Sequence, residues 1–194
     1  MKKVLLFAAF AAFAMTSVNA QDEDSSGFAK SDIYMTGTVG FNSASSGDAD
    51  SSDFNFSPAV GYMMSDNIAL EAGLSFGGAT AADDSEVSTV GLNVGARWFM
   101  TPGEKFSLSV GVGLGYGTAT ASATGVDDVT ATGISFAVAP AINYWVSDSF
   151  GLVATVAALS YNSSELDIDG AEADTSFGLN LDLSDINFGM VYKF

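Results

Sequence analysis

The sequence predicts an all-β protein, an eight-stranded antiparallel up-and-down transmembrane β-barrel, and the end of the chain shows why. Ile186, Phe188, Met190, Tyr192 and Phe194 are apolar or aromatic, and mostly small or polar residues separate them. Because side chains alternate faces along a strand, this segment presents one fully apolar face. The same alternation recurs along the chain with few helical signals. We therefore expect lipid, rather than a protein core, to cover these faces.

Alternation and turn signals divide residues 32–194 into eight strands. We expect them near residues 33–42, 54–64, 68–76, 90–98, 106–117, 134–144, 150–161 and 175–194. The phase of the seventh strand is left open beyond residue 156. In the last strand the phase slips by one at Ser184-Asp185, which predicts a β-bulge.

The connections alternate in length. Those near residues 66, 102 and 147 are short, whereas those near 48, 84, 125 and 168 are long and acidic. Short periplasmic turns and longer extracellular loops are typical of bacterial outer-membrane barrels, and the aromatic residues gather near the two ends, as in interfacial girdles. A soluble β-sandwich is the alternative, but it would place polar groups on its outer faces, whereas the predicted faces are uniformly apolar.

Residues 1–20 are predicted to be a signal peptide. Lys2 and Lys3 precede a short apolar run, and Val18-Asn19-Ala20 supplies small residues for cleavage. A short buried helix is the alternative, but the acidic residues 22–24 that follow favour export. Residues 21–31 would then be a periplasmic N-terminal segment, and residues 32–194 the barrel.

Composition narrows the function further. The chain is 48% hydrophobic, yet its formal net charge is −17, and it has no cysteine. A barrel can separate these properties along its axis, with an apolar belt in the middle and charge at the ends. A chain with this much negative charge is not expected to bind the phosphate backbone of a nucleic acid. Without cysteine, neither a disulfide nor a lipoprotein anchor is expected.

These features resemble the small eight-stranded outer-membrane barrels of the OmpA, OmpX and OmpW type, over residues 32–194. Phe188, Met190, Tyr192 and Phe194 look like the signal that the barrel assembly machinery recognises, and residues 1–21 resemble export signals of Bacteroidota. The resemblance implies a place in the cell outer membrane, in contact with outer-membrane lipid and lipopolysaccharide. The chain departs from the two-domain members of this family, because no peptidoglycan-binding domain is expected after its last strand. The resemblance does not imply one activity.

The chemistry of an enzyme is not apparent in the sequence. The chain contains no histidine, the usual general base, so hydrolysis inside the barrel is not expected, and no cofactor is predicted. Gly111, Gly113, Gly115 and Gly117 share one strand face and no helix follows them, so they do not form a phosphate-binding loop. We interpret them as small lumen-facing residues.

Two opposite charges are predicted to face the lumen. If the hairpin between the third and fourth strands turns about Asp84, Glu71 lies directly opposite Arg97, and Phe76 lies opposite Leu92 on the lipid face. A lumen ion pair would reduce the cost of an isolated charge in a narrow barrel. The alternative is that each charge is hydrated separately.

The acidic connection near residue 168 is a weak candidate for a cation site. Asp167, Asp169, Glu172 and Asp174 place oxygen ligands at intervals that resemble calcium loops, without the full EF-hand pattern. The simpler interpretation is solvated charge. Divalent cations could also bridge the acidic loops to lipid A phosphates.

The function predicted from the sequence is that of a non-enzymatic outer-membrane β-barrel with a structural or surface-interaction role and acidic extracellular loops. A porin-like conduit for small solutes is the alternative. Eight strands enclose little more than side chains. Tyr34, Met63, Phe99 and Trp145 are expected to narrow the periplasmic end, although the small residues elsewhere leave room for water.

Overall fold

The structure, a computed structural model, describes residues 26–46, 49–83, 85–155, 159–168, 170–179 and 187–194. Over these ranges the chain is all-β, and they contain no helix with the length and apolar character needed to cross a membrane. The strands are β1 (Ile33–Ser46), β2 (Ala49–Met63), β3 (Ile68–Thr80), β4 (Glu86–Phe99), β5 (Phe106–Ala123), β6 (Val126–Trp145), β7 (Phe150–Thr155), β8 (Leu159–Leu166), β9 (Asp174–Leu179) and β10 (Asn187–Lys193).

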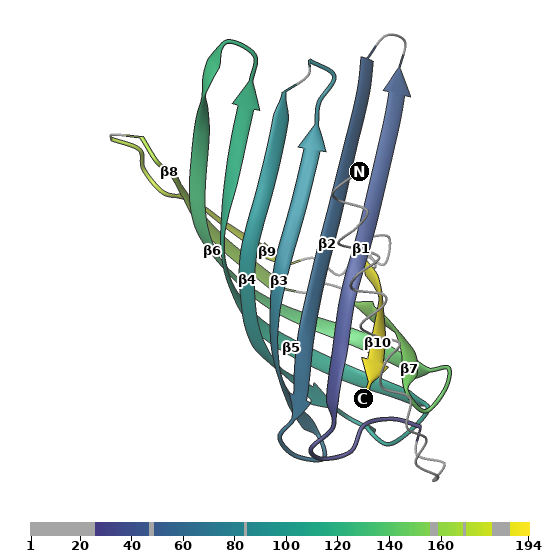
Figure 1. The fold of residues 1–194 in the computed structure, drawn as a ribbon. Helices are drawn as coiled ribbons and strands as arrows, with labels where there is room; N and C mark the ends of the chain where they lie inside the picture. Colours follow the sequence, from purple (N-terminus) through teal and green to yellow (C-terminus); the bar gives the residue numbers. More distant parts are fainter. Residues whose placement is uncertain (1–25, 47–48, 84, 156–158, 169, 180–186) are drawn as a thin grey trace.

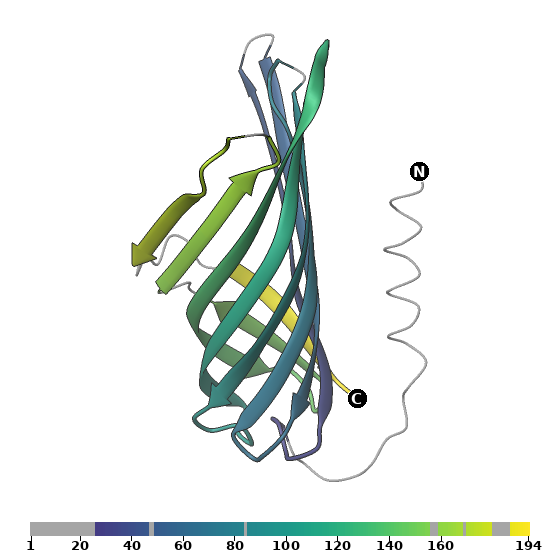
Figure 2. The same ribbon diagram turned by 90° about the vertical axis from the view of Figure 1, so that its left-hand side faces the viewer.

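The strands close into an eight-stranded antiparallel barrel, which confirms the predicted fold (Figures 1 and 2). The ring runs from β1 through β6 to β7, then to β10, which pairs with β1. β7 pairs with residues 141–145 of β6, and β8 pairs with residues 131–138 of the same strand, so β8 continues the position of β7. β9 pairs with β8 on its other side. The ten segments therefore occupy eight positions around the barrel.

The register changes between the two halves of the seventh and eighth positions. Thr155 of β7 lies opposite Asn187 of β10, whereas Leu159 of β8 lies opposite Leu179 of β9. Between these two pairs the chain numbering advances by four in the seventh position, from Thr155 to Leu159, and by eight in the eighth position, from Leu179 to Asn187. The predicted bulge at Ser184-Asp185 lies outside the described residues and stays a prediction.

The strands extend farther from the short turns than predicted. β5 and β6 stay in register as far as Ala121 and Val129, pair again at Ala123 and Val126, and turn tightly at Gly125, whose φ is +80°. The expected long connection near residue 125 is therefore wrong, and near residue 48 strand β1 also continues to Ser46 before β2 begins at Ala49. The extensions were not predicted because they consist mainly of Thr, Ser, Ala and Asp and lack large apolar side chains. Such segments keep the backbone ladder but lose the apolar alternation that marks a lipid-facing strand.

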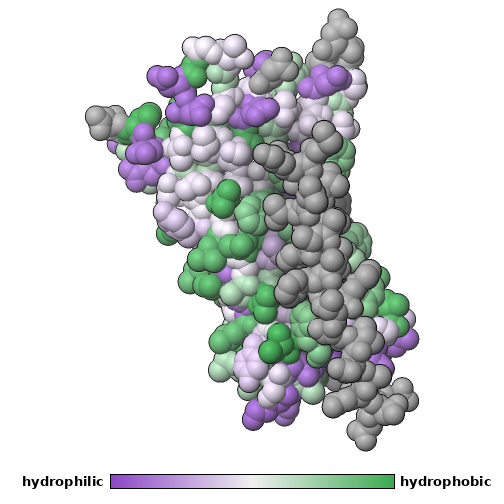
Figure 3. All heavy atoms as spheres, viewed as in Figure 1, coloured by the Kyte–Doolittle hydropathy of each residue, from purple (hydrophilic) through white to green (hydrophobic). Residues whose placement is uncertain are grey.

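The outer face of the barrel carries a band of exposed apolar side chains, and on the face that Figure 3 shows they gather below the polar upper part. Along β5 the outward residues run from Phe106 to Tyr116, a span of eleven residues, before Thr118 and Thr120 follow on the same face. A tilted membrane strand needs about 9–11 residues, so this band matches the bilayer core. The large outward side chains at its two borders are exposed, as the predicted girdles require: Tyr62, Trp98, Phe106, Tyr144 and Phe194 at one border, and Phe41, Phe54, Phe76, Tyr116 and Phe177 at the other.

Candidate functional site

The lumen holds an ion pair between two adjacent strands. Arg97 of β4 donates from Nε to Oε1 of Glu71 on β3 at 2.9 Å, and from Nη2 to Oε2 at 3.2 Å. Both side chains are 16% exposed. Two parallel bonds between a guanidinium and a carboxylate fix the geometry of both groups more firmly than a single contact does.

The predicted register of this hairpin is wrong by two residues. Arg97 lies opposite Ala69, and Glu71 lies opposite Gly95, so the ion pair is diagonal; Phe76 likewise faces Val90 rather than Leu92. The hairpin is centred one residue earlier than expected because Asp83 organises the turn: its Oδ1 accepts hydrogen bonds from the backbone N–H and hydroxyl of Ser85. A shift of two keeps every side chain on its predicted face, and long side chains reach across the diagonal.

Tyr34 of β1 completes this polar group. Its hydroxyl donates to Oε1 of Glu71 at 2.7 Å, which links three strands across the lumen. Two glycines make the arrangement possible. A Cβ at Gly61 would overlap the Tyr34 ring, and one at Gly111 would lie 3.3–3.4 Å from the Arg97 guanidinium.

A buried aromatic cluster fills the short-turn end of the lumen, below the ion pair. Tyr34, Met63, Phe99 and Trp145 point inward and are at most 1% exposed, where their predicted faces place them. The cluster also contains Phe28, which precedes the first strand. The sequence reasoning missed this residue, although a lone aromatic side chain in the small and polar run of residues 25–31 is a usable signal.

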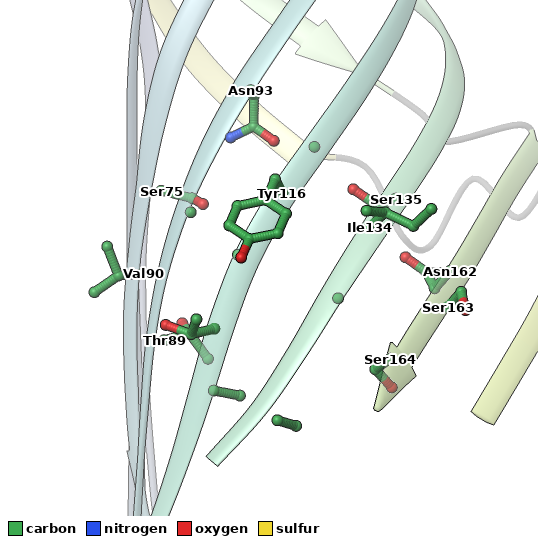
Figure 4. Close-up of a pocket in the computed structure, with 17 residues that line it drawn as sticks. Ser75, Thr89, Val90, Asn93, Tyr116, Ile134, Ser135, Asn162, Ser163 and Ser164 are labelled. Atoms are coloured by element: carbon green, nitrogen blue, oxygen red, sulfur yellow. The ribbon is translucent and has the colours of Figure 1, made fainter. Parts of the chain in front are cut away.

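The lumen is roomier above the ion pair. A cavity of about 250 Å³ borders Glu71, Arg97 and Asn93, and a second of about 480 Å³ lies nearer the outer end. Ser75, Asn93, Ser135 and Asn162, from four different strands, surround the second cavity (Figure 4). The glycines between them admit these side chains: a Cβ at Gly115 would lie within 2.7 Å of the Asn93 Oδ1 and overlap the Ser135 hydroxyl. The wall of this second cavity is therefore uncharged, and it combines these polar side chains with glycine, alanine and a few larger apolar residues.

The remaining predicted site residues lie elsewhere. Phe188, Met190 and Phe194 of the terminal row are exposed on the outer face, and Tyr192 is half-buried against the Phe194 ring, with ring centroids 5.2 Å apart. In the acidic connection, Asp167, Glu172 and Asp174 are exposed, and Asp169 lies outside the described residues. Within the described ranges, no three His, Cys, Asp or Glu side chains gather closely enough to hold a metal ion.

Comparison with known proteins identifies the class of protein that this barrel represents. Residues 8–194 match the family described as outer membrane protein beta-barrel domain. The chain belongs to this family and is a bacterial outer-membrane protein. Barrels of this class carry their longer segments on the extracellular side, so we expect the end that holds the aromatic cluster to face the periplasm. No curated protein matches the sequence.

Two solved structures share the fold. The outer membrane protein OprG from Pseudomonas aeruginosa aligns with a TM-score of 0.53 at 14% identity, over 87% of this chain and 98% of OprG. Neisserial surface protein A aligns with a TM-score of 0.51 at 17% identity, over 84% of this chain and 97% of that protein. Neither the family description nor the names of these structures refer to an enzymatic activity.

Proposed function

We propose that this protein is a non-enzymatic barrel with a surface-interaction role, which it performs with the outer parts of strands β1 to β6. The observation that carries the proposal is the length of these strands beyond the apolar band. Of the 18 residues of β5, eleven lie within the band, and residues 117–123 continue past it while still paired with β6. The protein therefore raises a polar, hydrogen-bonded sheet above the membrane rather than a set of short loops (Figure 1).

The tips of this sheet are acidic, which defines the chemistry of the partner. Exposed carboxylates lie at the outer ends of three hairpins and at the end of β8: Asp50 and Asp53, Asp83 and Glu86, Asp127 and Asp128, and Glu165 and Asp167. A surface of one charge sign attracts partners of the opposite sign and raises their association rate. We propose cationic surfaces, or divalent cations that bridge to the phosphates of lipopolysaccharide, as its partners.

Assembly is the second proposed interaction. The apolar row of β10 faces outward at the periplasmic border of the band, where the first and last strands meet. This position leaves Phe188, Met190 and Phe194 accessible from outside the barrel. We propose that the barrel assembly machinery recognises this row.

A porin-like conduit remains the second candidate, and the two lumen cavities favour it. A solute that entered the outer cavity would next meet the Glu71–Arg97 pair and then the aromatic cluster. These groups occupy the lumen in series, which supports the surface role over conduction.

The test shortens the sheet and leaves the membrane band intact. In the variant, residues 119–131 are replaced by Asn-Gly, a turn that suits the hairpin closed by the Thr118–Thr132 pair. Cells that carry equal amounts of either protein in the outer membrane are then compared for retention on a polylysine-coated surface. We expect retention to fall several-fold, whereas equal retention would count against the surface role. Asp127→Asn with Asp128→Asn removes the same two carboxylates and keeps the sheet, so it separates the effect of charge, which should lower retention part of the way, from the effect of the sheet.

A further inference from the structure

Residues 26–32 cross the periplasmic mouth of the barrel. In the eight-membered ring, the β4–β5 turn lies on the side opposite β1. The segment leads directly into β1, where Ser31 N–H donates to the Met63 carbonyl at 2.9 Å and Met63 N–H donates to the Asp32 carbonyl at 2.9 Å. Phe28 N–H nevertheless donates to the carbonyl of Pro102, in the β4–β5 turn, at 2.6 Å. The segment therefore spans the opening from one wall to the other.

The backbone of Gly27 allows this crossing. Its φ is +113°, a conformation that residues with a side chain rarely adopt, and a Cβ would overlap the Pro102 carbonyl oxygen. Only glycine can bring the chain so close to the far turn at this position.

The Phe28 side chain fills the centre of the opening; we call it the stopper. It is 4% exposed, and its ring centroid lies 4.5 Å from that of Tyr34, 4.9 Å from that of Phe99 and 4.8 Å from that of Trp145. The tilted and edge-on arrangements are those that aromatic pairs prefer. These rings lie on three different strands of the wall, so a single side chain joins the wall into one apolar seal.

Lys193 holds the segment in place. Its Nζ donates to the Gly27 carbonyl at 2.6 Å, lies 3.7 Å from Oδ2 of Asp32 and sits 5.5 Å from the centre of the Trp145 ring. Asp32 also accepts a hydrogen bond from Ala29 N–H at 2.8 Å. Lys193 belongs to β10 and lies opposite Tyr34 of β1, so this contact is available only when the first and last strands have met.

We propose that residues 26–32 form a periplasmic plug, with Phe28 as the stopper and Lys193 as the latch, that seals the lumen and opens without unfolding the barrel. Beyond the two backbone bonds that join Ser31 and Asp32 to Met63, side-chain packing, one hydrogen bond to the far wall and one lysine hold the plug across the mouth. Continuous backbone ladders, in contrast, hold the strands. Its opening would connect the cavity of about 250 Å³ beside Glu71 and Arg97 to the periplasm. The proposal does not depend on the surface role proposed above.

The absence of cysteine from the chain makes the plug directly testable. Ala69, fully buried in the aromatic cluster, is replaced by Cys as a reporter, and the protein is refolded into vesicles with its periplasmic end accessible. A membrane-impermeant maleimide then reports access to the lumen. We expect Ala69→Cys to react at least a hundredfold more slowly than Ser147→Cys in an exposed turn. Adding Phe28→Ala or Lys193→Met should accelerate the reaction at least tenfold.

Lys105→Met is the matched control, because Lys105 Nζ also lies 5.5 Å from the centre of an aromatic ring, but that ring belongs to Tyr144, which is exposed on the outer face of the barrel. It should leave the labelling rate unchanged. Ala139→Cys, which lines the inner cavity, is a second reporter if Ala69→Cys does not fold. The proposal fails if the reporter reacts as fast as Ser147→Cys, or if both plug variants leave the rate unchanged. It also fails if faster labelling occurs only in the fraction that has lost the heat-modifiable band of the folded barrel.

Discussion

Replacement of Arg97 by Met should destabilise the barrel more than replacement of both members of the ion pair. The change removes two charge-assisted hydrogen bonds, at 2.9 and 3.2 Å, and leaves the Glu71 carboxylate with the Tyr34 hydroxyl. Breaking a fully buried pair costs about 3–5 kcal/mol because one charge remains without its partner. The lumen cavity beside the pair gives the carboxylate some access to water, so we expect about 2–3 kcal/mol here.

Glu71→Gln and the variant with both changes complete a double-mutant cycle with Arg97→Met. Glu71→Gln leaves a buried guanidinium and should cost about 2–3 kcal/mol, whereas Arg97→Met with Glu71→Gln should cost less than either single change, for a coupling of at least ~2 kcal/mol. Tyr34→Phe removes one hydrogen bond to a charged acceptor and should cost about 1.5 kcal/mol.

The free energy of unfolding is measured by urea titration of the barrel refolded in lipid vesicles. The fluorescence of the two tryptophans reports unfolding, and the heat-modifiable gel band provides an independent probe. Additivity of the two single changes to within about 0.5 kcal/mol would refute the reasoning, because residues that do not interact give additive effects.

Three further predictions concern other parts of the molecule. Phe194→Asp places a charge at the border of the apolar band and should sharply reduce the amount of protein in the outer membrane, measured by membrane fractionation; normal levels would exclude the assembly role of the terminal row. Gly61→Ala forces the Tyr34 ring to move and should cost about 1–3 kcal/mol, a loss that Tyr34→Ala should relieve if the overlap is the cause. Hydrogen bonds from the Ser85 hydroxyl and N–H hold the pKa of Asp83 below its usual value, so Ser85→Ala should raise this pKa in an NMR titration. Because a lowered pKa stabilises the folded state above the ordinary pKa, any contribution of this turn is lost as the pH falls through the Asp83 pKa.

The alternation of side chains was sufficient to predict the barrel, its strand order and the face of most strands, although the phase of the seventh strand was left open beyond residue 156. Tyr34, Met63, Phe99 and Trp145 all point into the lumen as expected, because a period of two fixes the face without knowledge of any partner strand. For the same reason the Glu71–Arg97 contact survives an error of two residues in register.

Features that depend on a particular turn could not be predicted in this way. The side-chain hydrogen bonds of Asp83, rather than any property of the strands, centre the β3–β4 hairpin. The outer extensions of β5 and β6 were missed because threonine and alanine carry no apolar signal once a strand leaves the bilayer. Phe28 was missed because its packing depends on the way residues 26–32 cross the mouth of the barrel. Gly27 permits this path, and no periodic pattern in the sequence reveals it.

We infer that the lumen is closed by the Glu71–Arg97 pair in the middle and by the aromatic cluster with Phe28 at the periplasmic end. Single-channel recording of the refolded wild-type protein in planar bilayers tests it most directly. We predict no steady conductance above that of the bare bilayer, because these groups fill the narrow section of an eight-stranded barrel. A large and stable conductance, selective for cations as the acidic outer hairpins would favour, would contradict the account and identify the protein as a porin.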